Sequence, residues 1–308
     1  MLVLSLVPLL MGAAIACQSA VNARLRRQVG SPFFASLVSF GVGFIFLGIL
    51  LLLSGTGKAV TFEFIASSPW WLWLGGLTAA CALTANVLLF EKLGATETTV
   101  LPMAGQIAMG TVIDEFGMFG APLLEMNWQK ALGLFVIFLG LTAATGALKG
   151  NKGNSGKGKN LYRLLGFGAG SLLAVQTAVN GSLGQWLGSP LEAAWLAFGV
   201  SFLALLAICK AQCLSILEML SRLPKTWRED KRIFTGGVLG SSYVLLSAIL
   251  APILGTSTVL VVALLGQLIT SACQDNWGLM WQARRRLSQG NLAGLLLMVF
   301  GTCLVRIV

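Results

Sequence analysis

The chain repeats itself. Residues 12–44 return 158 positions later as residues 170–202, with 15 of 33 positions identical. The polar motif Gln-x-x-x-Asn recurs at the same place in both copies, as Gln18 and Asn22 and again as Gln176 and Asn180. The duplication constrains the fold because each half must be able to form the same structure.

Beyond these segments the two halves correspond at a spacing of 161 residues. Pairs at this spacing include Gly75 with Gly236, Gly105 and Gln106 with Gly266 and Gln267, Asp114 with Asp275, and Gly140 with Gly301. We therefore divide the chain into a first repeat at residues 1–150, a basic cytoplasmic linker at 151–161, and a second repeat at 162–308.

The composition indicates that the solvent of both repeats is lipid. The chain is 56% apolar and only 10% charged, which is more apolar surface than a soluble core of this size hides. Crossing the hydrocarbon layer takes about 20 apolar residues. Ten such spans are expected, at 2–23, 33–54, 69–90, 96–113, 130–148, 162–183, 190–212, 233–251, 255–273 and 290–307. The predicted fold is an all-α integral membrane protein of two five-helix repeats.

Charge placement predicts the orientation of these spans. If the loops alternate between two sides, 18 of the 21 Lys and Arg residues fall on one side. The positive-inside rule places that side in the cytoplasm and both termini outside. An odd number of spans turns the second repeat upside down, and the charges agree, since Arg24 and Arg26 correspond to Ser182 and Gly184. This pattern is typical of inverted-topology repeats in transporters. The net charge of +10 thus indicates a lipid bilayer partner rather than nucleic acid.

Polar side chains inside apolar spans are functional candidates, because burying them in lipid is costly. Gln106 and Gln267 lie near the middle of equivalent spans, and we expect them to form a central substrate-binding site. Gln18, Asn22, Gln176 and Asn180 are expected along the path to it. Amides donate and accept hydrogen bonds, which suits neutral polar or amphiphilic substrates. The alternative is that the amides only bond across helix interfaces and hold the bundle together.

Asp114 and Asp275 each follow their glutamine by eight residues, toward the end of the span. We interpret them as gating residues, one at each mouth of the path. The alternative is a solvated or ion-paired helix end. In that reading, Asp275 has Arg24, Arg26 or Arg284 as partners.

The sequence offers no candidate chemistry for an enzyme. There is no histidine, no carboxylate in the centre of any predicted span, and no cysteine spacing of a metal site. We expect no cofactor and no metal, and proton coupling through a buried carboxylate has no support.

Several short motifs resemble the YdcZ family of the drug/metabolite transporter superfamily. They are Gln18-x-x-x-Asn22-x-x-Leu25, Gly30-Ser-Pro32, Gly94, Gly105-Gln106 and Asp114-x-Phe-Gly117. The resemblance covers nearly the whole chain twice, although members are usually single five-helix units that pair in opposite orientations. It implies a multi-pass transporter, often described as an exporter, in the bacterial plasma (inner) membrane. Small multidrug exporters of the same superfamily carry a glutamate in their first helix, and Gln18 is the nearest polar residue here.

The expected function is therefore a secondary transporter that moves, and in the favoured direction exports, a small organic metabolite or lipophilic compound by alternating access. The alternatives are a non-transporting membrane scaffold and a carrier that flips lipids. Because both halves are present in one chain, we expect a monomer to suffice.

Overall fold

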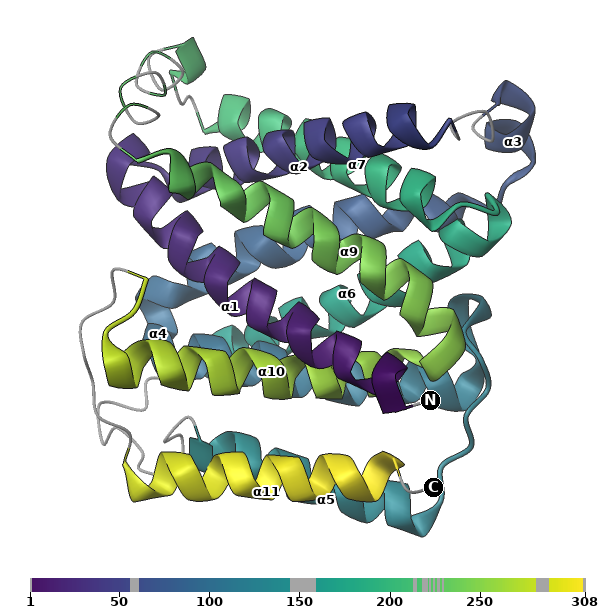
Figure 1. Cartoon of the computed structure of the whole chain (residues 1–308), viewed down its shortest axis with the longest axis vertical. Coiled ribbons are helices and arrows are strands. Elements are labelled where there is room, and N and C mark those ends of the chain that lie inside the picture. Colours follow the sequence, from purple (N-terminus) through teal and green to yellow (C-terminus); the bar gives the residue numbers. More distant parts are fainter. Residues whose placement is uncertain are drawn as a thin grey trace.

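The computed structural model describes residues 2–55, 61–144, 159–212, 230–280 and 288–306, together with isolated positions between 215 and 228. Every regular element in these ranges is helical, which confirms the all-α expectation for them. In Figure 1 the long helices run roughly between the left and right sides of the molecule and lie beside one another along its vertical axis. Residues 151–158 of the expected linker at 151–161 lie outside the described residues, and 159–161 are the first residues of a helix.

The long helices follow the predicted spans closely, with one exception. They are α1 (Leu2–Val29), α2 (Pro32–Ser54), α4 (Leu74–Phe116), α5 (Trp128–Ala144), α6 (Lys159–Trp186), α7 (Pro190–Ala211), α9 (Thr235–Leu254), α10 (Thr256–Trp277) and α11 (Gln289–Arg306). Short helical turns complete the described elements, namely α3 (Phe62–Ser67), η1 (Trp70–Trp73), η2 (Met118–Gly120) and η4 (Lys231–Phe234).

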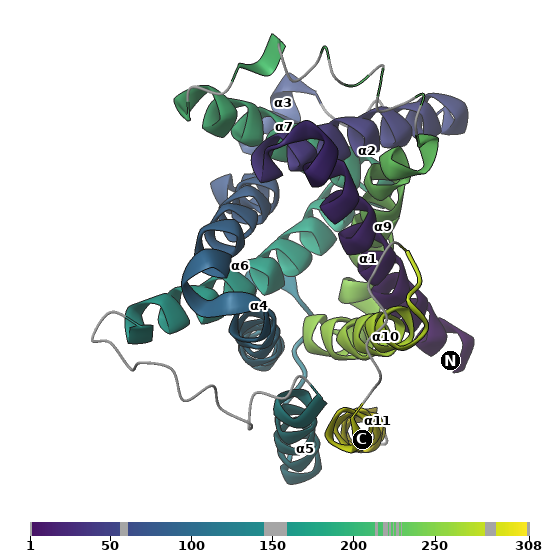
Figure 2. The same cartoon turned by 90° about the vertical axis from the view of Figure 1, so that its left-hand side faces the viewer.

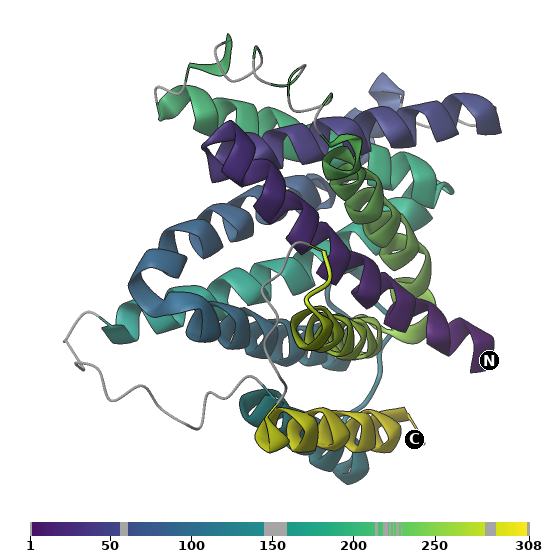
Figure 3. The same ribbon diagram turned by 60° about the vertical axis from the view of Figure 1, so that its left-hand side comes forward.

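The exception is α4, in which the two spans predicted at 69–90 and 96–113 are joined without a loop. It is helical for 43 residues, which at 1.5 Å per residue is roughly enough for two crossings of the hydrocarbon layer. Figure 3 shows that α4 runs out to one end of the molecule and then turns back. The only strong breaker between the predicted spans is Gly94, and one glycine costs a helix only about 1 kcal/mol.

Six helices within the described residues are long and apolar enough to cross a membrane, namely α1, α2, α6, α7, α9 and α10. Helices α5 and α11 are apolar but shorter. Figures 1 and 2 show α5 and α11 packed together at one end of the molecule, below the other helices.

The turns that separate the first two helices of each half have the same construction. Gly30 and Gly188 adopt positive φ angles of 82° and 63°. The hydroxyls of Ser31 and Ser189 then accept hydrogen bonds from the backbone N–H three residues on, and a proline begins the next helix. Positive φ favours glycine, serine caps a helix N-terminus, and proline suits the first helical turn. The Gly-Ser-Pro repeated in the sequence therefore marks the turn between the first two long helices of each half.

Successive helices run in alternating directions between two faces of the molecule (Figure 1). We call one the basic face, because α1 ends there with Arg26 and Arg27 and α7 ends there with Lys210. The opposite face holds both labelled chain ends and is called the terminal face. Helix α1 runs from the terminal to the basic face, whereas its counterpart α6 runs the other way (Figures 1 and 3).

Glycines bring the backbones of the two halves into direct contact. A Cβ added to Gly12 would lie 1.8 Å from the carbonyl oxygen of Ala263, and one added to Gly170 would lie 1.9 Å from that of Pro102. The same reciprocity holds for α5 and α11, where a Cβ on Gly140 would lie 2.8 Å from the oxygen of Gly294, and one on Gly301 2.8 Å from that of Gly133. Small residues permit such close helix packing in membranes. These glycine contacts in one half thus have their equivalents in the other, in the register expected from the sequence.

Candidate functional site

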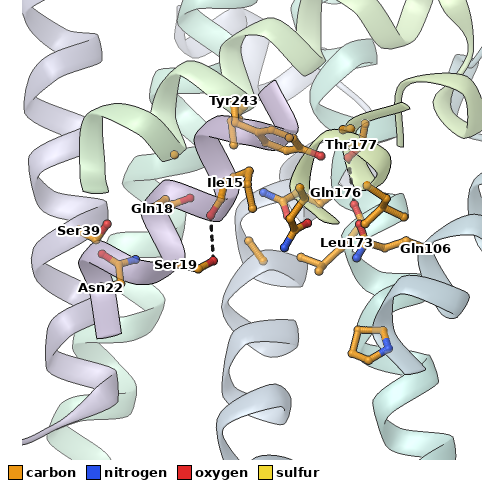
Figure 4. Close-up of a pocket in the computed structure, with 18 of the residues that line it drawn as sticks. Ile15, Gln18, Ser19, Asn22, Ser39, Gln106, Leu173, Gln176, Thr177 and Tyr243 are labelled. Carbon is orange, nitrogen blue, oxygen red and sulfur yellow. Dashed lines mark hydrogen bonds between the residues drawn. The ribbon is translucent and has the colours of Figure 1, made fainter. Parts of the chain in front are cut away.

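A cavity of about 390 Å³ lies between the two halves. Its walls come from α1, α2, α4, α6, α7, α9 and α10, so that neither half forms it alone. Figure 4 shows side chains from several helices converging on it. Cavities formed between helices of a bundle are common ligand sites.

Four glutamines predicted from the sequence meet in this cavity, namely Gln18, Gln106, Gln176 and Gln267. All four side chains are half-buried, and none forms a side-chain hydrogen bond with the described part of the chain. The geometry therefore leaves donors and acceptors directed at a space where a ligand or water can meet them. Within the described ranges, these four side chains do not form the interhelical amide bonds of the alternative interpretation.

The two asparagines of the repeated motif are placed differently. Asn22 lines the cavity. Asn180 does not, and it is only 1% exposed. Each packs against a glycine of the other half, since a Cβ on Gly236 would lie 2.5 Å from Oδ1 of Asn22 and one on Gly75 2.0 Å from Oδ1 of Asn180. Both polar atoms of the Asn180 side chain lack a hydrogen-bond partner in the structure.

Several lining residues were not identified from the sequence, namely Ser36, Ser39, Phe40, Phe198 and Tyr243. Phe40 and Phe198 are equivalent positions in the repeated window, and their rings are 4.9 Å apart. A signal was available in each case. The serines interrupt an apolar span, and Tyr243 lies inside a predicted span rather than at its end, where interfacial aromatics gather.

Asp114 lies away from the cavity and is fully buried, with no exposed surface. Its carboxylate accepts hydrogen bonds from the backbone N–H groups of Thr256 and Ser257, both at 2.7 Å, and from the Ser257 hydroxyl. These are the first residues of α10, so Asp114 caps that helix and neutralises the positive end of its dipole. The solvated or ion-paired helix end considered above does not describe Asp114. The side chain of Asp275 lies outside the described residues.

On the basic face, Arg24 pairs with Asp230, which precedes η4 and is 8% exposed. The Nε–Oδ2 distance is 3.4 Å, and Arg232 contacts the other carboxylate oxygen at 3.0 Å. The hydrogen bond from Arg232 is the main cause that holds the pKa of Asp230 below its usual range. Arg24 is one of the three partners considered for Asp275 (Arg24, Arg26 or Arg284); its contact in the described part of the chain is with Asp230.

The lining residues that the structure describes include no acidic or basic side chain. Within the described residues, no group of three or more Cys, Asp or Glu side chains is placed to hold a metal ion. The available interactions are hydrogen bonds from amides and hydroxyls and contact with aromatic and aliphatic groups.

Comparison with known proteins identifies similar sequences and one similar fold. The profile of the family described as "Putative inner membrane exporter, YdcZ" matches the chain twice, at residues 3–143 and 161–304. The inner membrane protein YdcZ of Escherichia coli strain K12 is 26% identical over 112 residues, which are 36% of this chain and 74% of that protein. A crystal structure with 13% sequence identity aligns with 97% of this chain and 96% of its own at a TM-score of 0.65, a likeness of fold alone.

Proposed function

Because the chain belongs to the YdcZ family of the drug/metabolite transporter superfamily, we propose that it is a secondary transporter that exports a small organic compound by alternating access. Its place is the bacterial inner membrane, which it crosses several times. The observation that supports this function is the cavity between the halves, with four glutamine side chains that form no hydrogen bond to the described residues.

The proposed topology has ten crossings in two inverted repeats, residues 1–150 and 162–308, joined by the linker at 151–161. Three features support it: the alternating directions of the helices (Figure 1), the reciprocal glycine contacts and the two separate matches of the family profile. The basic face is assigned to the cytoplasm by the positive-inside rule, with both termini external. Two halves related in this way can exchange conformations, which is the basis of alternating access.

The present conformation is assigned as open toward the basic face. The cavity extends to Asn22, Ser36 and Ser39, near the basic end of α1 and α2, while Asn180 on the terminal side is buried. On that side Asp114 fixes the end of α4 to the start of α10. In the proposed cycle these two helix ends separate when the terminal side opens, which gives Asp114 its gating role, with Asp275 acting in the equivalent place.

Purified protein provides the test. Compounds that raise its melting temperature in a metabolite screen would be assayed for counterflow in proteoliposomes. The double variant Gln106→Ala with Gln267→Ala should lower the counterflow rate at least tenfold, about 1.4 kcal/mol or more. Gln185→Ala, an exposed glutamine on α6, is the matched control and should leave the rate unchanged. Equal rates in the double variant and the wild type would exclude the cavity as the transport site.

The scaffold alternative is tested by labelling. A cysteine at position 106 that never reacts with water-soluble thiol reagents from either side of the membrane would favour a scaffold. A lipid-flipping carrier would instead move fluorescent phospholipids between leaflets in the same proteoliposomes.

A further inference from the structure

We infer that the substrate is an uncharged amphiphile, with a flat apolar ring and a group that both donates and accepts hydrogen bonds, of the carboxamide kind. The inference rests on the proposed function and names the substrate class of the same cavity. Three features of the cavity carry it, which are its lack of charge, its amides and its aromatic wall.

None of the described residues that line the cavity carries a charge that could pair with an ion. Two buried carboxylates outside the cavity already have partners. Asp114 binds the N-terminus of α10, and Asp230 contacts Arg24 and Arg232. An ion that enters such a cavity loses its hydration without gaining a counter-ion, and this loss is far larger than that of an uncharged polar group. The cavity therefore discriminates against both cations and anions.

The amides determine which neutral groups fit. Gln18, Gln106, Gln176 and Gln267 each present an NH₂ donor and a carbonyl acceptor, and neither is used by another described side chain or by the described backbone. A ligand that only accepts hydrogen bonds would leave the glutamine carbonyls unsatisfied. A ligand that only donates them would leave the glutamine NH₂ groups unsatisfied. Unpaired buried polar groups reduce affinity strongly, so a ligand with both functions is selected.

The apolar part of the wall favours a ring. Phe40 and Phe198 form a tilted aromatic pair. Tyr243 lines the cavity and is drawn above Ile15 in Figure 4, with its hydroxyl on the side of Thr177. Met103 and Leu264 add further apolar surface. Aromatic rings stack or meet edge to face with flat ligands. A volume of about 390 Å³ is at the lower end for small-molecule sites and limits the ligand to one or two rings.

Tyr243 makes this wall one-sided. Its equivalent in the first half is Ala82, which does not line the cavity. The polar residues Ser19, Asn22, Ser36 and Ser39 lie toward the basic face. A bound amphiphile would place its ring against Tyr243, Phe40 and Phe198 and its polar group against the amides.

The test uses near-isosteric probes that differ in charge. Benzamide, benzoate and benzamidinium, and the same three derivatives of naphthalene, would be titrated against the purified full-length protein at pH 7 by saturation-transfer NMR. We expect the carboxamide of at least one ring size to bind at least tenfold more tightly than both of its ions. Tyr243→Ala should weaken carboxamide binding at least fivefold.

A charge introduced into the cavity should reverse the preference. Gln267→Glu is expected to make benzamidinium or its naphthalene analogue the tightest ligand of its set, while Gln185→Glu on the exposed surface leaves the wild-type order unchanged. An ion that binds wild type as tightly as its carboxamide would overturn the inference, and so would a lack of binding by all six probes. Counterflow of a charged compound that is lost in the Gln106→Ala and Gln267→Ala double variant would also overturn it, while leaving the transporter function intact.

Discussion

The two ends of the cavity are built from equivalent residues but differ in what covers them. Asn22 lines the cavity near the basic face, and its counterpart Asn180 is buried near the terminal face. Phe119 and Met280, also equivalent, both adopt positive φ angles, of 56° and 52°. The two halves thus share this backbone conformation but differ in the exposure of the equivalent asparagines. The same structural unit is therefore present in two different environments within one structure.

Side chains of both halves meet at the terminal end, where the proposed conformation is closed. Phe119 packs against a cluster that includes Ala174 and Ala178 of α6, and its ring centroid lies 5.7 Å from that of Trp71. The hydroxyl of Ser182 donates a hydrogen bond to the carbonyl oxygen of Phe119. At the basic end the equivalent of Ser182 is Arg24, which pairs with Asp230 instead. Closure at one end is therefore apolar and neutral, and contact at the other is ionic.

Thiol labelling tests most directly whether the two ends of the cavity differ in accessibility. In a chain whose six native cysteines are replaced by serine or alanine, Asn22→Cys should react with a water-soluble maleimide from the basic face. Asn180→Cys should react about 100-fold more slowly from either face, as for a site that must first open at a cost of about 3 kcal/mol. Equal reaction rates would mean that the two ends are equally open.

The buried cap of α10 should give the next largest effect. Asp114→Ala removes three hydrogen bonds to a carboxylate, and we expect the free energy of unfolding to fall by about 3 kcal/mol. Ser257→Ala removes one of the three and should cost about 1 kcal/mol. Denaturant titration in detergent measures both.

The same cap should control the terminal end. In the Asp114→Ala background, labelling of Asn180→Cys should become faster, and labelling of Asn22→Cys should not change. If Asp114→Ala costs less than about 1 kcal/mol, or leaves Asn180→Cys unreactive, the cap does not hold that end closed.

The glycine contacts test the opposite expectation, because equivalent substitutions in the two halves should have the same cost in stability. A Cβ on Gly105 would lie 2.0 Å from the oxygen of Phe167, and one on Gly266 2.0 Å from that of Leu9. Each alanine substitution should cost about 2 kcal/mol through overpacking. Gly168→Ala is the matched control, because a Cβ there meets no atom within 4 Å, and it should be neutral or stabilise by up to about 1 kcal/mol. A large difference between Gly105→Ala and Gly266→Ala would show that the repeats pack unequally.

Much of this arrangement follows from the sequence because duplication makes contacts reciprocal. The spacings of 158 and 161 residues predicted which glycines correspond, and the glutamines were found because each is repeated within an apolar span. Other features depend on the conformation and have no sequence signal. The exposure of Asn22 and the burial of Asn180 differ although the motifs are identical, and the continuity of α4 depends on how tertiary packing overrides one glycine.

Asp114 shows a different limit of sequence reasoning. Its position near the end of α4 suggested a solvated or gating carboxylate, yet its hydrogen-bond partners lie 142 and 143 residues away. Gly255 has a φ of 85° and turns the chain at the start of α10, which exposes the two N–H groups that Asp114 binds. Only the three-dimensional packing reveals such a cap.

The ionic contact at the basic end should give the smallest effect, and one that depends on pH. The pKa of Asp230 is lowered, mainly by the Arg232 hydrogen bond. A lowered carboxyl pKa stabilises the folded state above the unfolded-state pKa of about 3.9 and loses that contribution as the pH falls through the folded-state value. Asp230→Asn should therefore melt at a slightly lower temperature than wild type at pH 7. The loss in free energy of unfolding should be less than about 1 kcal/mol, because Arg232 is largely exposed. The two should have the same melting temperature once the pH is below the folded-state pKa of Asp230. Ser182→Ala, at the neutral end, should show a difference that does not change with pH, so a pH-independent difference for Asp230→Asn as well would remove the distinction between an ionic and a neutral end.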